Sequence, residues 1–141
     1  MTNDKGSHSG TRPNGKQLPC RRSYDLADRT ARFAEGVILF AREIPKTAVT
    51  FPLIGQVVRS GTSIGANYCE ADDAVSRKDF RNRICICRKE ARETKYWIRM
   101  IAVAVAELRD EARPLWQEAK ELHLIFSKAF HSAGRPRTGQ D

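Results

Sequence analysis

The stretch SRKDFRNRICICRKEARETKYWIRMIAVAV, residues 76–105, decides the fold. Ser76, with Asp79 three residues later, resembles a helix capping box in which Asp replaces the usual Glu or Gln. After this cap, small and apolar side chains recur in alternating steps of four and three residues, which is the period of a helix buried against partners at shallow crossing angles. This seam consists of Phe80, Ile84, Cys87, Ala91, Thr94, Ile98, Ile101 and Val105. The stretch therefore predicts one long bundle helix.

Three further amphipathic helices are predicted around it. The first runs from Asp25, a plausible N-cap, to a stop at Pro45. The second begins near Pro52 and ends near Asp72, and the last begins at Pro114, because proline suits the first turn of a helix and breaks its interior. The connections are short, so consecutive helices run antiparallel. We therefore predict an all-α, up-down-up-down, antiparallel four-helix bundle over residues 23–133.

Three glycines lie inside the second predicted helix, Gly55, Gly61 and Gly65, and the last two are in line with Cys69. Glycine weakens a helix by roughly 1 kcal/mol, so a packing reason is needed, and we predict that another helix approaches closely here. A phosphate loop is not indicated, because the GxxxxGK[ST] pattern is missing. Polar side chains are predicted to fasten this helix to the next, namely Arg59, Asn67, Glu70, Glu90, Glu93 and Tyr96.

The charge of the chain is concentrated at its ends. The 141 residues carry a formal net charge of +8, of which residues 1–22 supply +4 and residues 134–141 supply +1. The first end is rich in Gly, Ser, Asn and Pro, and the second in Gly and Pro. Both have little to bury, so we predict disordered tails at 1–22 and 134–141. The first lacks the apolar core of a signal peptide, and no apolar run is long enough to cross a bilayer. A cytoplasmic protein without a membrane partner is expected.

A row of cations follows one flank of the long helix. Projected at 100° per residue, it lies directly beside the apolar seam. Cations repeated at helical spacing favour contacts with phosphates rather than with bases. We call this row the basic stripe and predict that it binds RNA or DNA; its members are Arg77, Arg81, Arg88, Arg92, Lys95 and Arg99. The alternative is a solvated face, or half of a subunit interface, in a protein-interaction scaffold that binds no nucleic acid.

The opposite flank of the same helix carries acidic and aromatic residues, among them Glu90, Glu93 and Trp97. A helix with one basic and one acidic flank can meet its own copy heterologously, as a closed ring requires. Apolar residues outside the main seams add to this argument, because a large exposed apolar patch is unusual on a monomer. They are Ile86, Trp97, Met100, Trp116 and Phe130. We therefore predict a homo-oligomer larger than a dimer.

Catalysis, cofactors and metal ions are not expected. Cys85 and Cys87 point roughly 200° apart on a helix and cannot clamp one metal, and Cys20 and Cys69 offer no CxxC pair. The Glu-x-x-His pairs of di-iron bundles are missing from the last helix. His123 lacks the preceding Arg of HEPN-type ribonucleases, so it is interpreted as an ordinary helix residue. The sequence predicts no enzyme.

Four segments carry a resemblance to a known family: YDLADRTARFA (24–34), IPKT (44–47), RSGTSIGANYCEADDAVSRKDF (59–80) and KEARETKYWIRM (89–100). They resemble the bacterial four-helix bundle family first associated with intervening sequences in 23S ribosomal RNA genes, the S23 proteins. Ile98 stands where the family pattern has Leu, a conservative difference. The resemblance implies a homo-oligomer, commonly a pentameric ring. It also implies kinship with the accessory protein of diversity-generating retroelements, a basic pentamer that binds nucleic acid and a reverse transcriptase.

Overall fold

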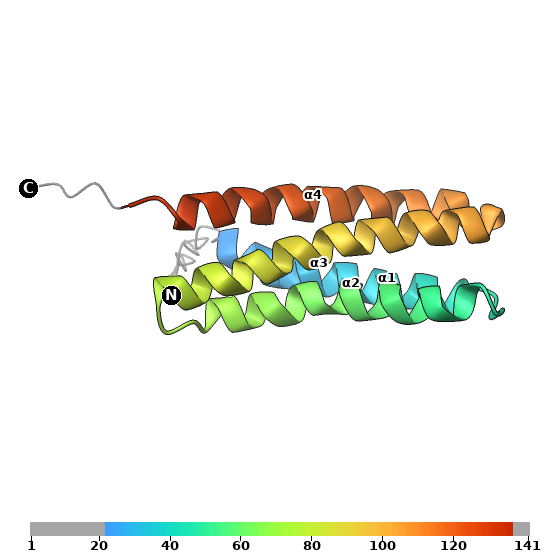
Figure 1. Cartoon of the computed structure of the whole chain (residues 1–141), viewed down its shortest axis with the longest axis horizontal. Helices are drawn as coiled ribbons and strands as arrows, with labels where there is room; N and C mark the ends of the chain where they lie inside the picture. The colour runs from blue at the N-terminus through green and yellow to red at the C-terminus, as the bar shows by residue number, and fades with distance from the viewer. Residues whose placement is uncertain (1–21, 137–141) are drawn as a thin grey trace, which may run out of the picture.

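The computed structural model describes residues 22–136, with side chains described from Leu26 onward. The described part contains no strand. Its elements follow one another with short connections and run up and down along one axis (Figure 1). They are α1 (Arg22–Glu43), α2 (Thr50–Asp72), α3 (Arg77–Ala104), the short 3-10 helix η1 (Ala106–Leu108) and α4 (Arg109–Ala133). The predicted all-α four-helix architecture is confirmed. Of the predicted tails at 1–22 and 134–141, residues 1–21 and 137–141 lie outside the described residues.

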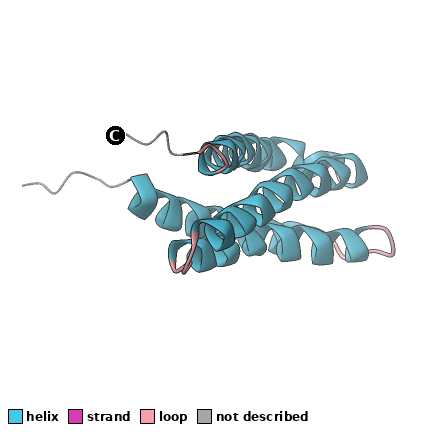
Figure 2. Ribbon diagram, turned by 60° about the vertical axis from the view of Figure 1, so that its left-hand side comes forward, coloured by secondary structure: helices cyan, strands magenta, loops and turns pink. Residues whose placement is uncertain are grey.

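The long helix α3 occupies the middle of the structure. It packs along its whole length against α2 on one side and α4 on the other, whereas α1 packs mainly on α2 and only lightly on α4 (Figures 1 and 2). The α1–α4 edge is therefore the loosest side of the bundle. Within residues 22–136, every helix is too short or too polar to be a candidate membrane span.

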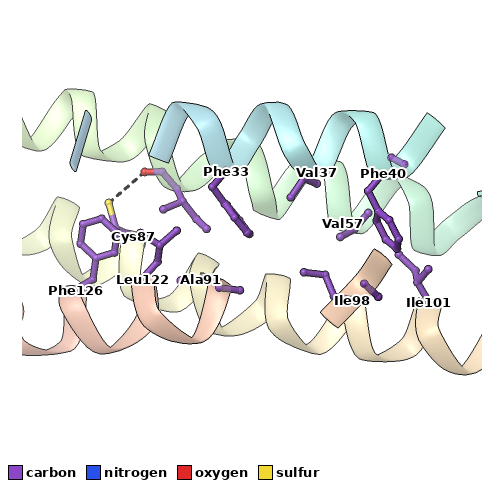
Figure 3. Packing of buried hydrophobic residues seen from close by; sticks show 14 of the residues in the cluster. Phe33, Val37, Phe40, Val57, Cys87, Ala91, Ile98, Ile101, Leu122 and Phe126 are labelled. Atoms are coloured by element: carbon purple, nitrogen blue, oxygen red, sulfur yellow. Dashed lines mark hydrogen bonds between the residues drawn. The ribbon is translucent and has the colours of Figure 1, made fainter. Parts of the chain in front are cut away.

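The predicted seam of α3 forms the centre of the core. Ile84, Ala91, Ile98 and Ile101 are buried among side chains of the other three helices (Figure 3). Cys87, in the same row, donates its thiol to the carbonyl oxygen of Ile64 at 3.5 Å, and burial raises the pKa of this thiol to about 12. The thiol therefore stays protonated and acts as a small core side chain.

The start of α3 forms the Ser76 half of the predicted capping box, and within the described residues no bond from the backbone N–H of Ser76 to the Asp79 side chain completes it. The side-chain oxygen of Ser76 accepts a hydrogen bond from the backbone N–H of Asp79 at 3.1 Å, and Asp79 lies in the first turn, where a negative charge is favoured. Ser76 has extended backbone angles, as an N-cap residue requires. The cap thus fixes the residue at which the long helix begins.

Close approach of α1 explains the glycines of α2. A Cβ atom placed on Gly61 would lie 2.9 Å from Cγ1 of Val37, and one placed on Gly65 would lie 3.3 Å from Oγ1 of Thr30. The predicted packing role is confirmed for Gly61 and Gly65, with α1 as the neighbour, and is wrong for Gly55, where a Cβ atom would meet nothing within 4 Å. The predicted position of Cys69 on this face is wrong, because Cys69 is exposed.

The buried face of α2 lies one residue away from the predicted line. It contains Val57, Gly61, Ile64 and Tyr68, and the ring of Tyr68 packs against that of Phe126 on α4 at a centroid distance of 5.9 Å. Large side chains, rather than glycines, therefore fix the centre of this face, and the glycines lie toward its α1 border.

Two predicted helix starts are wrong. Helix α4 begins at Arg109 and includes Pro114, and α1 begins at Arg22 rather than after Asp25. Proline is tolerated in α4 because the carbonyl that loses its N–H partner belongs to Asp110, an exposed residue that water can reach. Asp110 and Glu111 also lie in the first turn, where the helix dipole stabilises carboxylates. The solvent-accessible carbonyl and the two carboxylates thus offset the free-energy cost of a proline inside the helix.

Candidate nucleic-acid interface

All six residues of the basic stripe lie where α3 faces α4 or the segment that follows it. Arg77 donates to the carbonyl oxygens of Ala133 and Arg135 at 3.2 and 3.1 Å, while the other five lie beside the side chains of α4. Across residues 26–136, no member of the stripe is ion-paired with a carboxylate. We call this surface, with the residues of α4 that border it, the α3–α4 groove.

Two aromatic rings of α4 lie beneath the cations. The guanidinium carbons of Arg81 and Arg88 lie 4.0 and 4.5 Å from the centroid of the Phe130 ring. The ammonium nitrogens of Lys95 and Lys120 lie 5.5 and 5.8 Å from the centroid of Trp116. These cation–π contacts orient the charged groups along the groove.

The same contacts correct an expectation about exposed apolar surface. Trp116 and Phe130 were predicted to lie outside the main seams and to contribute to an apolar patch. They are instead half-buried, packed against the core and bordered by cations. The stems of the arginines and lysines cover apolar surface while their charged heads remain near water.

Three hollows follow one another along the groove. The first, of about 420 Å³, is bordered by Arg77, Arg81 and Arg135. The second, of about 340 Å³, is lined by Arg88, Lys89, Arg92, His123 and Ser127. The third, of about 380 Å³, is lined by Arg99, Arg109, Arg113 and Trp116 together with apolar residues.

The hollows recur with the period of the helix. Arg77, Arg88 and Arg99 are eleven residues apart, which is close to three helical turns, so they lie about 16.5 Å apart on nearly the same face. The row spans about 33 Å from Arg77 to Arg99. The groove therefore offers a regular line of positive sites.

The pKa of the histidine in the second hollow is affected by the positive charges around it. The pKa of His123 lies below its usual value, first because of burial and then because of the positive charges of Lys95, Arg92 and Arg88. The imidazole is therefore predominantly neutral at neutral pH. Within residues 26–136, the side chains of His123 and Ser127 have no hydrogen-bond partner, so both keep free polar atoms for a ligand.

The acidic flank of α3 is used inside the chain. Arg59 of α2 pairs with Glu90 at 3.2 Å and also with Glu93, which in turn accepts a hydrogen bond from Nε1 of Trp97 at 3.1 Å. The predicted network between α2 and α3 is confirmed for Arg59, Glu90 and Glu93. The two carboxylates therefore share one cationic partner, which reduces the negative charge that this flank can offer to the basic stripe of another copy.

The remaining members of the predicted network behave differently. Asn67 accepts a hydrogen bond from Arg83 at 3.4 Å, so it joins the two helices through a residue that was not predicted. Glu70 and Tyr96 are exposed and take no part in the network within the described residues.

Sequence reasoning missed the contribution of α4 to the groove. Patterns within a single helix predict only apolar surface at Trp116 and Phe130 and an ordinary helix position at His123. A signal was present, because five residues of α4 step by four and three along one face, as the seam of α3 does. They are Trp116, Lys120, His123, Ser127 and Phe130. This second row is difficult to recognise in the sequence because its residues are neither uniformly apolar nor uniformly charged.

Comparison with known proteins matches the chain to a family model and to solved structures. The family model described as 23S rRNA-intervening sequence protein matches residues 22–128. A crystal structure of a protein of unknown function from the S23 ribosomal protein family of Bacteroides thetaiotaomicron superposes with a TM-score of 0.71 at 29% sequence identity. That match covers 79% of this chain and 99% of the other. No curated protein matches.

Proposed function

The chain belongs to the 23S rRNA-intervening sequence protein family, and from that premise we propose that it is a non-catalytic protein that binds nucleic acid through the α3–α4 groove. The single observation that carries this proposal is the basic stripe, whose six cations face α4 without a carboxylate partner in the described part of the chain. Unpaired cations that repeat along a groove concentrate positive potential, which attracts a polyanion.

Phosphates are the groups that this groove suits. Arginine and lysine contact phosphate oxygens, and such contacts position a nucleic acid without reading its sequence. The spacing of the three hollows supports a polyanion that lies lengthwise along the groove, since their span of about 33 Å is close to one turn of B-form DNA. Slight sequence preference is expected.

The alternative interpretation, in which a second copy covers the stripe, receives less support. It needs a complementary acidic surface, and the acidic flank of α3 is partly neutralised by Arg59 of the same chain. If Glu90 and Glu93 paired with the basic stripe of a second copy, their ion pairs with Arg59 would be lost.

A salt series with labelled RNA and DNA tests the proposal. The full chain is expected to bind both at low salt, with the logarithm of the association constant falling by about 0.9 per logarithmic unit of salt for each duplex-DNA phosphate neutralised. A chain shortened to residues 22–136 should retain salt-dependent binding, because the groove is intact. Binding by the full chain alone would assign it to the terminal segments, and no binding by either would favour the interaction scaffold.

We also propose that the chain assembles with copies of itself into a ring, as the family resemblance implies, with a pentamer as the expected size. Exposed apolar side chains at one end of the bundle support an interface there. Leu39, Phe51 and Val103 are 59%, 71% and 73% exposed, and they come from the ends of α1, α2 and α3 that lie together. Such residues are candidates for contact with another protein surface. A cytoplasmic location and a reverse-transcriptase partner remain predictions.

Replacement of Phe51 by Asp tests the assembly. Light scattering of the unchanged chain at micromolar concentration is expected to give a mass larger than that of a dimer, and Phe51→Asp is expected to reduce it by placing a charge in the interface. Val75→Asp is the matched control, because Val75 is 95% exposed in the α2–α3 connection at the opposite end. A monomeric mass for the unchanged chain would refute the ring.

A further inference from the structure

The second hollow of the groove differs from the other two in its chemistry. It combines permanent cations with two neutral hydrogen-bonding side chains, since Arg88, Lys89 and Arg92 come from α3 while His123 and Ser127 come from α4. A volume of about 340 Å³ accommodates a compact anionic group together with part of its neighbours. The two helices thus supply charge from one wall and directed hydrogen bonds from the other.

We propose that this hollow is a discrete docking site for one phosphodiester of a nucleic-acid backbone, in which the α3 cations supply charge and His123 and Ser127 hydrogen-bond the phosphate oxygens. The inference rests on the proposed function and deepens it, because it names one site and the groups that recognise the ligand. A guanidinium offers several N–H donors in a fixed plane, a hydroxyl offers one donor, and a protonated imidazole offers two. Together they match a tetrahedral anion with several acceptor oxygens.

Binding at this site is coupled to the protonation of His123. In the empty groove, Arg88, Arg92 and Lys95 of α3 oppose a further positive charge on the imidazole. On α4 itself, Lys120 lies one turn before His123. On the α1 side, Glu118 is paired with Arg29 at 2.6 Å and lies about 140° around the helix from His123. The charges nearest the imidazole are therefore all positive.

A bound phosphodiester reverses this balance. Its negative charge beside the ring favours the imidazolium form, so the pKa of His123 is higher in the complex than in the free protein. The sign of the linkage follows: at a pH between the two pKa values, binding takes up a proton, and affinity rises as the pH falls through that interval. A difference of one pKa unit between the complex and the free protein corresponds to a tenfold change in affinity.

The experiment uses the full chain and oligouridylate without terminal phosphates, so that neither the backbone nor the bases titrate near neutral pH. The imidazole signals are followed by NMR across a pH series with and without this probe, and affinity is measured by fluorescence anisotropy at fixed salt. We expect the pKa of His123 to rise on binding, and affinity to increase as the pH falls from about 8 to about 5.5, by up to about tenfold for each unit by which the pKa rises. Inorganic phosphate at the same concentration is expected to have little effect, because it engages a single hollow.

Two variants separate this site from a general effect of the groove. His123→Gln should abolish most of the pH dependence while retaining binding at high pH. His131→Gln is the matched control, because His131 lies on the same helix, is exposed, and does not line this hollow; it should leave the pH dependence intact. The signal assignments follow from the same two variants.

The outcomes are distinguishable. Salt-dependent binding of oligouridylate with an unchanged pKa of His123 would overturn the docking site and leave the proposed function standing. A response to inorganic phosphate with no response to oligouridylate would assign the hollow to a free anion and also overturn the inference. Failure of the chain to bind any oligonucleotide at low salt would overturn the proposed function and this site with it.

Discussion

Exchange of Arg92, Arg99 and Arg113 together for glutamine is expected to make duplex-DNA binding less dependent on salt. The slope of the logarithm of the association constant against the logarithm of the salt concentration should become shallower by about 2.7, which is about 0.9 for each phosphate contact removed. The three residues are exposed, line the second and third hollows, and have no hydrogen bond or ion pair within residues 26–136. Their loss therefore removes charge without removing a contact that holds the fold. At about 50 mM salt the affinity is expected to fall on the order of 10³-fold.

A matched triple replacement makes this result specific. Arg32, Arg42 and Lys46 are exposed cations on α1 and just after it, away from the groove, and their exchange for glutamine changes the net charge by the same amount. This control is expected to keep nearly the full salt slope. Equal losses in the two triples would mean that net charge alone drives binding and that the groove has no special role. Circular dichroism should be unchanged in both, and the melting temperature of the control should shift only slightly, because the ion pair between Arg32 and Asp28 that it removes is exposed.

Replacement of Gly61 by Leu is expected to destabilise the bundle by about 1–3 kcal/mol, measured as the free energy of unfolding in denaturant. The added side chain would enter the space of Val37, which is fully buried and whose methyl groups lie 2.9 and 3.0 Å from the position of a Cβ atom. Neither helix can accommodate it without moving apart. The gain in helix propensity, roughly 1 kcal/mol, offsets only part of this cost.

Gly55 provides the matched control within the same helix. A Cβ atom there meets nothing within 4 Å, so Gly55→Ala is expected to stabilise the protein by up to about 1 kcal/mol. Adding Val37→Ala to Gly61→Leu should recover part of the lost stability, because the small residue opens the space that leucine needs. If Gly61→Leu melts at or above the temperature of the unchanged chain, close packing of α1 on α2 is not the reason for the glycine.

The fold was largely predictable because the sequence of α3 carries a long, regular helical pattern. Its apolar seam is regular over eight positions, and a period maintained that long has one structural interpretation. The errors fell where local rules compete with packing. Proline statistics placed the start of α4 at Pro114, whereas the exposed Asp110 carbonyl makes the lost hydrogen bond inexpensive. The glycine line misplaced the buried face of α2, because Tyr68 and Ile64 set its centre.

The interface was only half predictable, for a physical reason. Charges repeated along α3 can be projected on one helix, so the basic stripe was found from the sequence. The groups opposite them belong to a helix that is remote in sequence, and no single-helix projection relates Arg92 to His123. Arginine and lysine side chains lie over the rings of Trp116 and Phe130, and how far they cover the rings depends on their side-chain conformations. Such pairings appear only when the two helices are placed side by side.

The light packing of α1 on α4 bears on how the chain reaches this structure. Every heavily packed pair, α1 with α2, α2 with α3 and α3 with α4, consists of sequence neighbours joined by a short connection. The contacts that close the longest loop, between the first and last helices, are the sparsest. Such a topology has a low contact order, so little chain entropy is lost before contacts form, and rapid folding follows. A polypeptide leaving the ribosome can therefore consolidate each hairpin of helices as it emerges.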